Sequence, residues 1–178
     1  MFQQVASIDD QVAADVETWR SDLVAMIPTL RAFAWSLSRS SSDAEDLVQD
    51  TLIKALTHRE KFRAGTNLRA WLFTILRNTF YSATSRRSRE VLDEDGLHAA
   101  RLTSPPAQDW AAEFTALRRA LDTLPDEHRE AIVLVGAAGL SYEEAAAITG
   151  SALGTIKSRV HRARTRLAAE MQGPPASD

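Results

Sequence analysis

The chain has 178 residues, 44% hydrophobic and 25% charged, with a formal net charge of −3, which is ordinary for a globular protein of one domain or two small ones. It has no cysteine, which excludes disulfides, thiolate metal sites and cysteine nucleophiles. Its four histidines lack ligand-like spacing, so we expect no metal and no cofactor. No apolar run approaches a membrane span and the start does not resemble a signal peptide, so we expect a cytoplasmic protein.

The first patterned stretch begins at Asp22. From there apolar residues recur at helical spacing as far as Leu37, which predicts a helix. Pro28 lies inside this stretch and has no N–H to donate, so we expect a kink or a restart there. A serine-rich run at 38–42 then breaks the pattern, whereas residues 1–20 are acidic and only weakly patterned.

A second helix is predicted after the serine run, because Ser42 and Glu45 form a capping box. The expected buried side consists of Ala44, Leu47, Val48, Thr51, Leu52, Ala55 and Leu56. An acidic strip lies opposite, formed by Glu45, Asp46, Gln49 and Asp50. Capping alone explains acids in the first turn, such as Asp43 and Glu45. Asp46 and Asp50 lie too far along for that, and they predict a docking face for a basic partner.

A third, long helix is predicted over 67–89, after a loop marked by Gly65. Its apolar stripe is Leu68, Trp71, Leu72, Ile75, Leu76 and Phe80. Its C-terminal half instead mixes aromatic, amide, hydroxyl and guanidinium groups, on Arg77, Asn78, Tyr81, Ser82, Thr84, Arg86, Arg87 and Arg89. Such a mixture can stack on exposed bases and follow a phosphate backbone. Cations near a helix end also suit the helix dipole, so this segment alone is weak evidence for nucleic-acid binding.

The composition changes over residues 90–109, where acids outnumber bases and glycine and prolines interrupt any helix. This stretch predicts a flexible linker between two helical domains, 1–89 and 110–178, in an all-α fold. Helical patterning resumes in the second domain. There Pro125 is suited to the first turn of a helix that we expect to end near Gly136.

Residues 140–167 predict two helices joined by a tight turn. Ser141 and Glu144 form another capping box, Gly150 is suited to a left-handed helix end, and Ser151 can cap the next helix. The second helix is expected to bury Leu153, Ile156, Val160, Ala163 and Leu167. Its other face carries Lys157, Arg159, His161, Arg162, Arg164 and Arg166. The pattern is typical of a helix-turn-helix whose second helix enters the major groove, although a merely solvated basic face is the alternative.

The positive charge is local, because the whole chain is slightly acidic. A net charge of −3 is unsuited to a protein that holds DNA by bulk charge. Either a larger partner helps to deliver the DNA contact, or the acidic faces bind a partner of their own.

Four motifs together cover both predicted domains: AEDLVQDTLIKAL (44–56), NLRAWLFTILRN (67–78), the Leu-Pro step at 124–125, and GLSYEEAAAITGSALGTIKSRVHRAR (139–164). In this order they resemble the extracytoplasmic-function (ECF) sigma factors. LRAFAWSL (30–37) and RNTFYS (77–82) also resemble the subgroup that runs the general stress response of alphaproteobacteria. The resemblance implies a sigma region 2-like domain, a linker and a region 4-like helix-turn-helix domain. It also implies a non-enzymatic function, directing core RNA polymerase to specific promoters.

The resemblance further implies a role for each group of residues. An acidic face would bind a coiled coil of the polymerase, through Asp43, Asp46, Gln49 and Asp50. The third helix and the loop before it would open and line the −10 strand, through Asn67, Leu68, Asn78, Thr79, Tyr81, Arg86 and Arg87. The helix-turn-helix would contact the −35 element, through Ser141, Tyr142, Thr155, Lys157, Ser158, Arg159, His161 and Arg162. An anti-sigma factor, a small helical inhibitor, would be a further partner.

Two other functions remain open. One is a helix-turn-helix regulator that acts without polymerase, but in such a protein the first domain would have no function. A sigma-like decoy would only sequester an anti-sigma factor, but such decoys carry a receiver domain, and no strand–helix alternation of that kind occurs here. An enzyme is the least expected class, because the sequence has no Gly-rich phosphate loop and no nucleophile motif.

Overall fold

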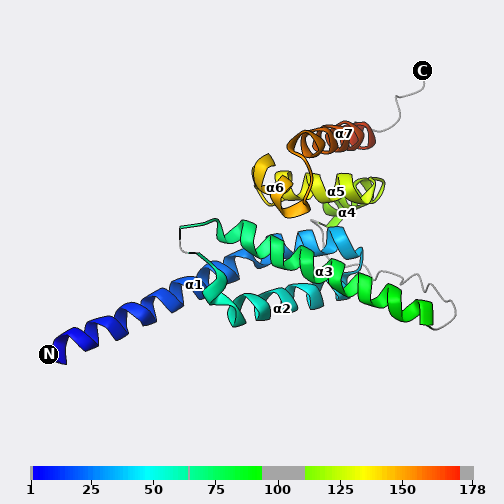
Figure 1. The fold of residues 1–178 in the computed structure, drawn as a ribbon. Helices are drawn as coiled ribbons and strands as arrows, with labels where there is room; N and C mark the ends of the chain where they lie inside the picture. The colour runs from blue at the N-terminus through cyan, green and yellow to red at the C-terminus, as the bar shows by residue number, and fades with distance from the viewer. Residues whose placement is uncertain (1, 64, 94–110, 173–178) are drawn as a thin grey trace, which may run out of the picture.

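The computed structural model describes the backbone of residues 2–63, 65–93 and 111–172, and the side chains of 17–63, 65–89 and 117–171. All the regular elements in these ranges are helical, which confirms the predicted all-α fold (Figure 1). In chain order they are α1 (Phe2–Ser38), α2 (Ser41–Thr57), the 3₁₀ turn η1 (Arg59–Lys61), α3 (Leu68–Asp93), α4 (Ala111–Asp122), α5 (Asp126–Ile132), the π-helical turn η2 (Val133–Ala137), α6 (Tyr142–Thr149) and α7 (Leu153–Gln172). No helix within the described ranges has both the length and the apolar character needed to cross a bilayer.

The N-terminal half is a bundle of α1, α2 and α3 (Figure 1). Its centre is formed by fully buried leucines together with Phe33 of α1 and Phe73 of α3, whose ring centroids lie 5.0 Å apart. A second aromatic group joins Trp19 of α1 to Phe62 and Trp71, with centroids 5.1 and 6.0 Å away. These contacts fix the loop that precedes α3 against the side of the bundle.

Helix α1 begins earlier than predicted, and the restart that was one of the two expectations at Pro28 does not occur. The helix is continuous from Phe2 to Ser38, so it does not restart at Pro28, and it includes the weakly patterned first residues. Proline in a helix interior costs about 3 kcal/mol. Pro28 is exposed, whereas Leu23 and Leu30 on either side of it are buried. Burial of the flanking turns therefore holds the helix together across the proline.

The predicted capping box of α2 is wrong by two residues. The helix begins at Ser41, and its cap is Ser40, whose side chain accepts a hydrogen bond from the backbone N–H of Asp43 at 3.3 Å. Glu45 does not reach back to the cap, because its carboxylate pairs with Arg31 of α1 at 2.8 Å. A serine-rich run offers several equivalent caps, and the packing of α2 on α1 selects among them.

The C-terminal half contains α4 to α7, and here the local predictions are mostly confirmed. Ser141 and Glu144 form the predicted capping box, and Gly150 ends α6 in the left-handed conformation with φ of 65°. Ser151 does not cap α7, which begins two residues later. Instead its hydroxyl accepts a hydrogen bond from Arg159 at 3.0 Å.

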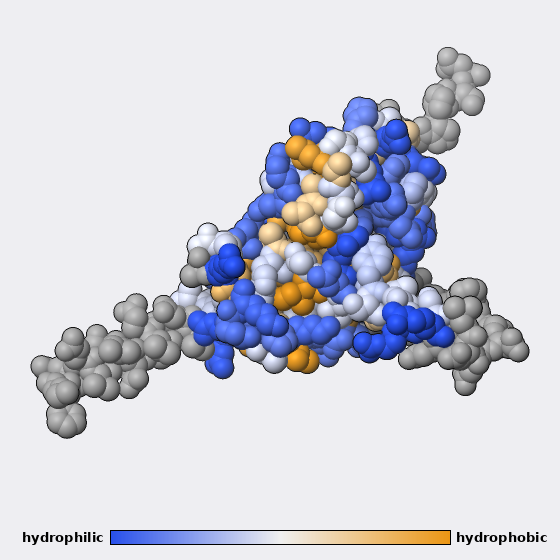
Figure 2. Space-filling model, viewed as in Figure 1, coloured by the Kyte–Doolittle hydropathy of each residue, from blue (hydrophilic) through white to orange (hydrophobic). Residues whose placement is uncertain are grey.

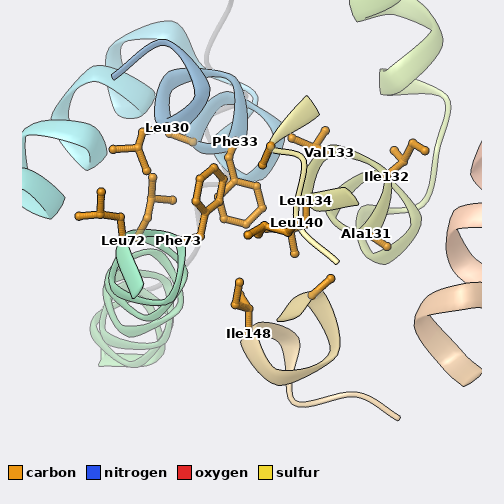
Figure 3. Close-up of a cluster of buried hydrophobic side chains, with 14 of the residues drawn as sticks. Leu30, Phe33, Leu72, Phe73, Ala131, Ile132, Val133, Leu134, Leu140 and Ile148 are labelled. Carbon is orange, nitrogen blue, oxygen red and sulfur yellow. The ribbon is translucent and has the colours of Figure 1, made fainter. Parts of the chain in front are cut away.

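The two halves share one continuous buried core. Figure 3 shows Phe33 and Phe73 of the N-terminal half facing Leu134 and Leu140 of the C-terminal half, and all four side chains are at most 3% exposed. On the face drawn in Figure 2, hydrophobic residues gather in a strip that crosses from one half to the other. The predicted linker falls largely on 94–110, outside the described residues, but the halves are packed together and not merely tethered.

Candidate nucleic-acid interface

Helix α7 has one buried and one exposed face. Ile156 and Val160 are completely buried against the rest of the C-terminal half. Lys157, His161 and Arg162 point outward, and none of the three side chains bonds to another described residue. Three donor-bearing side chains on one exposed helix face can contact phosphates and base edges in a major groove.

Arg159 lies on the same helix but is held by its neighbours. Its guanidinium donates to Glu127 of α5 at 2.6 Å and to Ser151 at 3.0 Å, and only 20% of the side chain is exposed. Ser158 is exposed, and its hydroxyl donates to the carbonyl of Thr155, which is half-buried. On α7, Lys157, His161 and Arg162 are therefore without internal partners, whereas Arg159 has two.

The other two predicted −35 residues lie at the start of α6. Tyr142 is half-buried, whereas Ser141 is exposed and caps the helix, accepting from the N–H of Glu144 at 3.1 Å. Glu144 in turn accepts from the N–H of Ser141 at 2.8 Å. This backbone hydrogen bond lowers the pKa of Glu144; burial partly opposes it, and hydrogen bonds from Asn67 and Ser141 reinforce it.

The lowered pKa of Glu144 predicts a pH-dependent contribution to stability. A carboxylate whose pKa falls on folding stabilises the fold above its unfolded pKa, and this contribution disappears as the pH falls through the folded value. We therefore expect Glu144→Gln to lower the thermal midpoint at pH 6, and the difference from wild type to shrink below pH about 4. Glu143→Gln, at an exposed neighbour with no partner among the described residues, should show no such convergence. A constant difference between wild type and Glu144→Gln across this range would contradict the assignment.

The C-terminal half of α3 carries the predicted −10 residues on two faces. Tyr81 is 42% exposed, and the Arg77 guanidinium lies 4.5 Å from its ring centre. Both side chains donate to Glu130 of α5, Arg77 at 2.6 Å and Tyr81 at 3.4 Å. Burial raises the pKa of Tyr81, and the nearby Glu130 charge adds to this effect. Arg86 and Arg87 are exposed further along the helix.

A pocket of about 280 Å³ opens on the other face of α3. It is lined by Lys54, His58, Lys61, Trp71, Ile75, Asn78, Thr79 and Ser82. Thr79 is buried, and its hydroxyl accepts from the Lys54 ammonium at 2.9 Å, so it positions the cation. The sequence reasoning missed the three basic residues of this pocket because they lie on and just after α2, about twenty residues before Asn78. The spacing of these basic residues in the sequence does not indicate that they lie close to Asn78 in the fold.

Asn67 and Leu68, at the start of α3, lie beside the C-terminal half. The Asn67 side chain accepts from the N–H of Ala70 at 3.3 Å and donates to Glu144 of α6. Leu68 is half-buried and lines a hollow that also includes Gly139. The structure thus separates these two predicted −10 residues from the basic pocket.

The acidic strip of α2 is exposed at Asp46, Gln49 and Asp50, whereas Asp43 is half-buried. The three aspartates line a groove of about 340 Å³ together with Arg87 of α3. Two apolar side chains extend the same helix surface, Ile53 at 61% and Leu56 at 52% exposure. The sequence pattern had assigned Leu56 to the buried side, and that assignment was wrong: its neighbour Ala55 is completely buried, whereas Leu56 lies on the exposed face of α2.

Two family models match the sequence, Sigma-70 region 2 over residues 23–90 and Sigma-70 region 4 over residues 114–167. The ECF RNA polymerase sigma factor EcfG of Rhodopseudomonas palustris is 54% identical over 162 residues, which cover 91% of this chain and 90% of that protein. SigE of Mycolicibacterium smegmatis, another ECF sigma factor, is 40% identical over 139 residues, which cover 75% of this chain and 54% of that protein.

A solved structure gives the same result. The fold is similar to that of the sigma factor RpoE from Bartonella quintana, solved in complex with the anti-sigma factor NepR. The TM-score is 0.77 at 50% identity, and the match covers 88% of this chain and 98% of RpoE. The family models, the relatives and the fold agree, and the chain belongs to the ECF family of RNA polymerase sigma factors.

Proposed function

We propose that this sigma factor divides promoter recognition between its halves, 1–89 and 110–178, and acts by binding, without catalysing a reaction. In this proposal α2 docks core RNA polymerase, α3 holds the −10 strand and α7 recognises the −35 element. The observation that carries it is the two-sided character of α7. Ile156, Val160 and Ala163 on its inner face are completely buried, while Lys157, His161 and Arg162 are left exposed without internal partners.

The basic pocket beside α3 is the proposed site for an unstacked base of the −10 strand. It combines three cationic or titratable side chains from α2 and the turn after it with the amide of Asn78 and the indole of Trp71. An amide can pair with a base edge, and an indole can support stacking, so the chemistry suits a single nucleotide with its phosphate. Lys54 is the group best placed to meet that phosphate, because Thr79 holds its ammonium at the pocket wall.

We further propose that a small helical anti-sigma factor regulates the chain in the cytoplasm, as part of a stress response. The support is the relationship to RpoE of Bartonella quintana, whose structure includes the anti-sigma factor NepR. The large exposed surface of α2, with its acids and its two apolar side chains, supplies an area that such an inhibitor could cover. Inhibitor and polymerase would then compete for the same helix.

Transcription in vitro tests the DNA-reading role. The chain with core polymerase should start transcription at a specific promoter, while the chain alone binds that promoter weakly. Arg162→Ala should reduce this transcription at least tenfold, because a base or phosphate contact contributes about 1–3 kcal/mol. Arg20→Ala removes the same charge from exposed α1 and should have little effect.

The outcome also separates the alternatives. Unchanged transcription with the Arg162→Ala variant would contradict the proposal that α7 recognises the −35 element. Tight, sequence-specific binding to duplex DNA without polymerase would favour a helix-turn-helix regulator. A chain that binds an anti-sigma factor but never supports transcription would be a decoy.

A further inference from the structure

Arg159 connects three segments of the C-terminal half. Its guanidinium donates to Glu127, in the first turn of α5, at 2.6 Å and to Ser151, in the turn between α6 and α7, at 3.0 Å. Only 20% of the Arg159 side chain is exposed, whereas the Glu127 side chain is 68% exposed. We call these two contacts the Arg159 clamp. The clamp joins α7 both to the helix against which it packs and to the turn that leads into it.

The place of Arg159 on α7 differs from that of the outward-pointing side chains. Arg159 lies three residues after Ile156 and four before Ala163, and both of these are completely buried. Residues three and four apart are neighbours on a helix surface, so Arg159 borders the buried stripe. The corresponding neighbours of His161 are all exposed, namely Lys157, Ser158, Arg164 and Thr165. The outer face of α7 is therefore centred near His161, and Arg159 lies at its edge, on the side of α5.

The clamp supplies a constraint that apolar packing lacks. Burial of Ile156 and Val160 is favourable but non-directional, so it does not fix the rotation of α7 about its own axis. Two hydrogen bonds from one planar guanidinium have fixed directions and restrict that rotation. A binding surface that is already held in its bound arrangement loses less conformational freedom when its ligand binds.

We propose that Arg159 is a positioning residue and not a DNA contact, and that its clamp with Glu127 and Ser151 sets the orientation in which α7 meets the −35 element. The resemblance to sigma factors implies instead that Arg159 contacts the DNA. The inference rests on the proposed function of α7. The two roles predict opposite effects for Glu127, because an acid near DNA weakens binding through its charge, whereas an acid that closes the clamp strengthens binding.

Glu127→Ala tests the direction of that effect. The probe is a fluorescein-labelled promoter duplex at which the wild-type polymerase complex starts transcription, and anisotropy gives the dissociation constant of the whole complex. Loss of the acid by itself would tighten binding, whereas we expect Glu127→Ala to weaken it about threefold through loss of the clamp. The matched control is Glu143→Ala, which removes another exposed acid from the first turn of a helix and should bind at least as tightly as wild type.

Substitutions of Arg159 itself separate the clamp from a phosphate contact. A lysine ammonium can still meet a phosphate, but it cannot donate to Glu127 and Ser151 in the fixed directions of a guanidinium. We therefore expect Arg159→Lys to lose about threefold in affinity although the charge is kept. Arg159→Ala should keep the wild-type slope of log affinity against log salt concentration. Lys157→Ala, at an exposed cation of the outer face, should make that slope shallower by about one.

A second measurement reports the orientation of α7 directly. Because the chain has no cysteine, Leu117→Cys on α4 and Met171→Cys at the end of α7 can carry a pair of spin labels within the C-terminal half, and both positions are exposed. We expect the distribution of label distances to be broader than wild type in Glu127→Ala and in Arg159→Lys. The distribution in Glu143→Ala should match the wild type.

Three results would overturn the inference while leaving the proposed function of α7 intact. They are wild-type or tighter binding by Glu127→Ala, a shallower salt slope in Arg159→Ala, and an unchanged distance distribution in both clamp variants. Wild-type affinity in both Lys157→Ala and Arg162→Ala would instead overturn the proposed function of α7, and this inference with it.

Discussion

Replacing Arg129 by alanine should lower the free energy of unfolding by about 3 to 5 kcal/mol, the range for removing one partner of a buried charged network. The side chain is 1% exposed although it belongs to a charged residue. It donates to the carbonyl of Ser36 at 2.6 Å, to that of Leu124 at 3.2 Å and to the carboxylate of Asp126 at 2.7 Å. A buried guanidinium is tolerated here because each of its three nitrogens donates to an acceptor.

The Ser36 contact explains why the effect should be large. Ser36 lies in the last turn of α1, where carbonyl groups have no partner within the helix. A cation at a helix C-terminus also interacts favourably with the helix dipole. Arg129 belongs to α5. Its guanidinium therefore caps the C-terminus of α1, bonds to a carbonyl of the turn before α5, and links the two halves. Alanine would leave both carbonyls buried and unpaired, at a cost of about 1–3 kcal/mol each.

Urea denaturation followed by circular dichroism measures the loss. Arg129→Lys should recover part of the stability, because an ammonium keeps the charge but cannot direct donors to three acceptors in one plane. Arg119→Ala, at an exposed arginine of α4, should stay within about 0.5 kcal/mol of wild type. If Arg129→Ala also stayed within about 0.5 kcal/mol of wild type, the Arg129 guanidinium would contribute little to holding the halves together.

The helices were predictable because their stripes are long and regular. The spacing of Leu68, Leu72 and Leu76 located α3, and the sequence around Gly150 located the turn between α6 and α7 with its capping box. Predictions from local sequence failed where several residues could serve equally well as a helix cap and tertiary packing determined which one does. Any of the serines before α2 could cap it, and only the pairing of Glu45 with Arg31 shows why the Ser42 box does not form.

Periodicity could predict on which helix face a candidate residue lies, but not how residues of different helices are arranged. Periodicity placed Lys157 and Arg162 on an outer face, where they lie. It could not show that Arg159 is held by Glu127, thirty-two residues earlier in the sequence. Contacts of this kind depend on how distant helices pack, and no periodic signal encodes them. The same limit applies to the pair between Arg77 and Glu130, which joins halves expected to be independent.

Reversing the charge of Asp46 and Asp50 together, as Asp46→Lys/Asp50→Lys, should reduce binding to core polymerase at least a hundredfold. The two carboxylates are exposed one turn apart on α2, and Ile53 lies one turn beyond them on the same face, 61% exposed. An acidic edge beside an exposed apolar side chain has the composition of an interface with a basic partner, and like charges placed opposite each other there cost several kcal/mol. Competition for core polymerase against the wild-type chain measures the loss.

A matched control separates a docking face from an effect of net charge. Glu17→Lys/Glu143→Lys makes the same change in charge at exposed positions of α1 and α6, and it should bind polymerase almost as well as wild type. The docking double variant should also keep the helical content and unfolding midpoint of the wild type, because neither aspartate packs in the core. Equal losses in the two double variants would indicate a general electrostatic attraction. An undiminished affinity in Asp46→Lys/Asp50→Lys would place the polymerase contact on another surface, and the inhibitor proposed to compete for α2 would then need another surface as well.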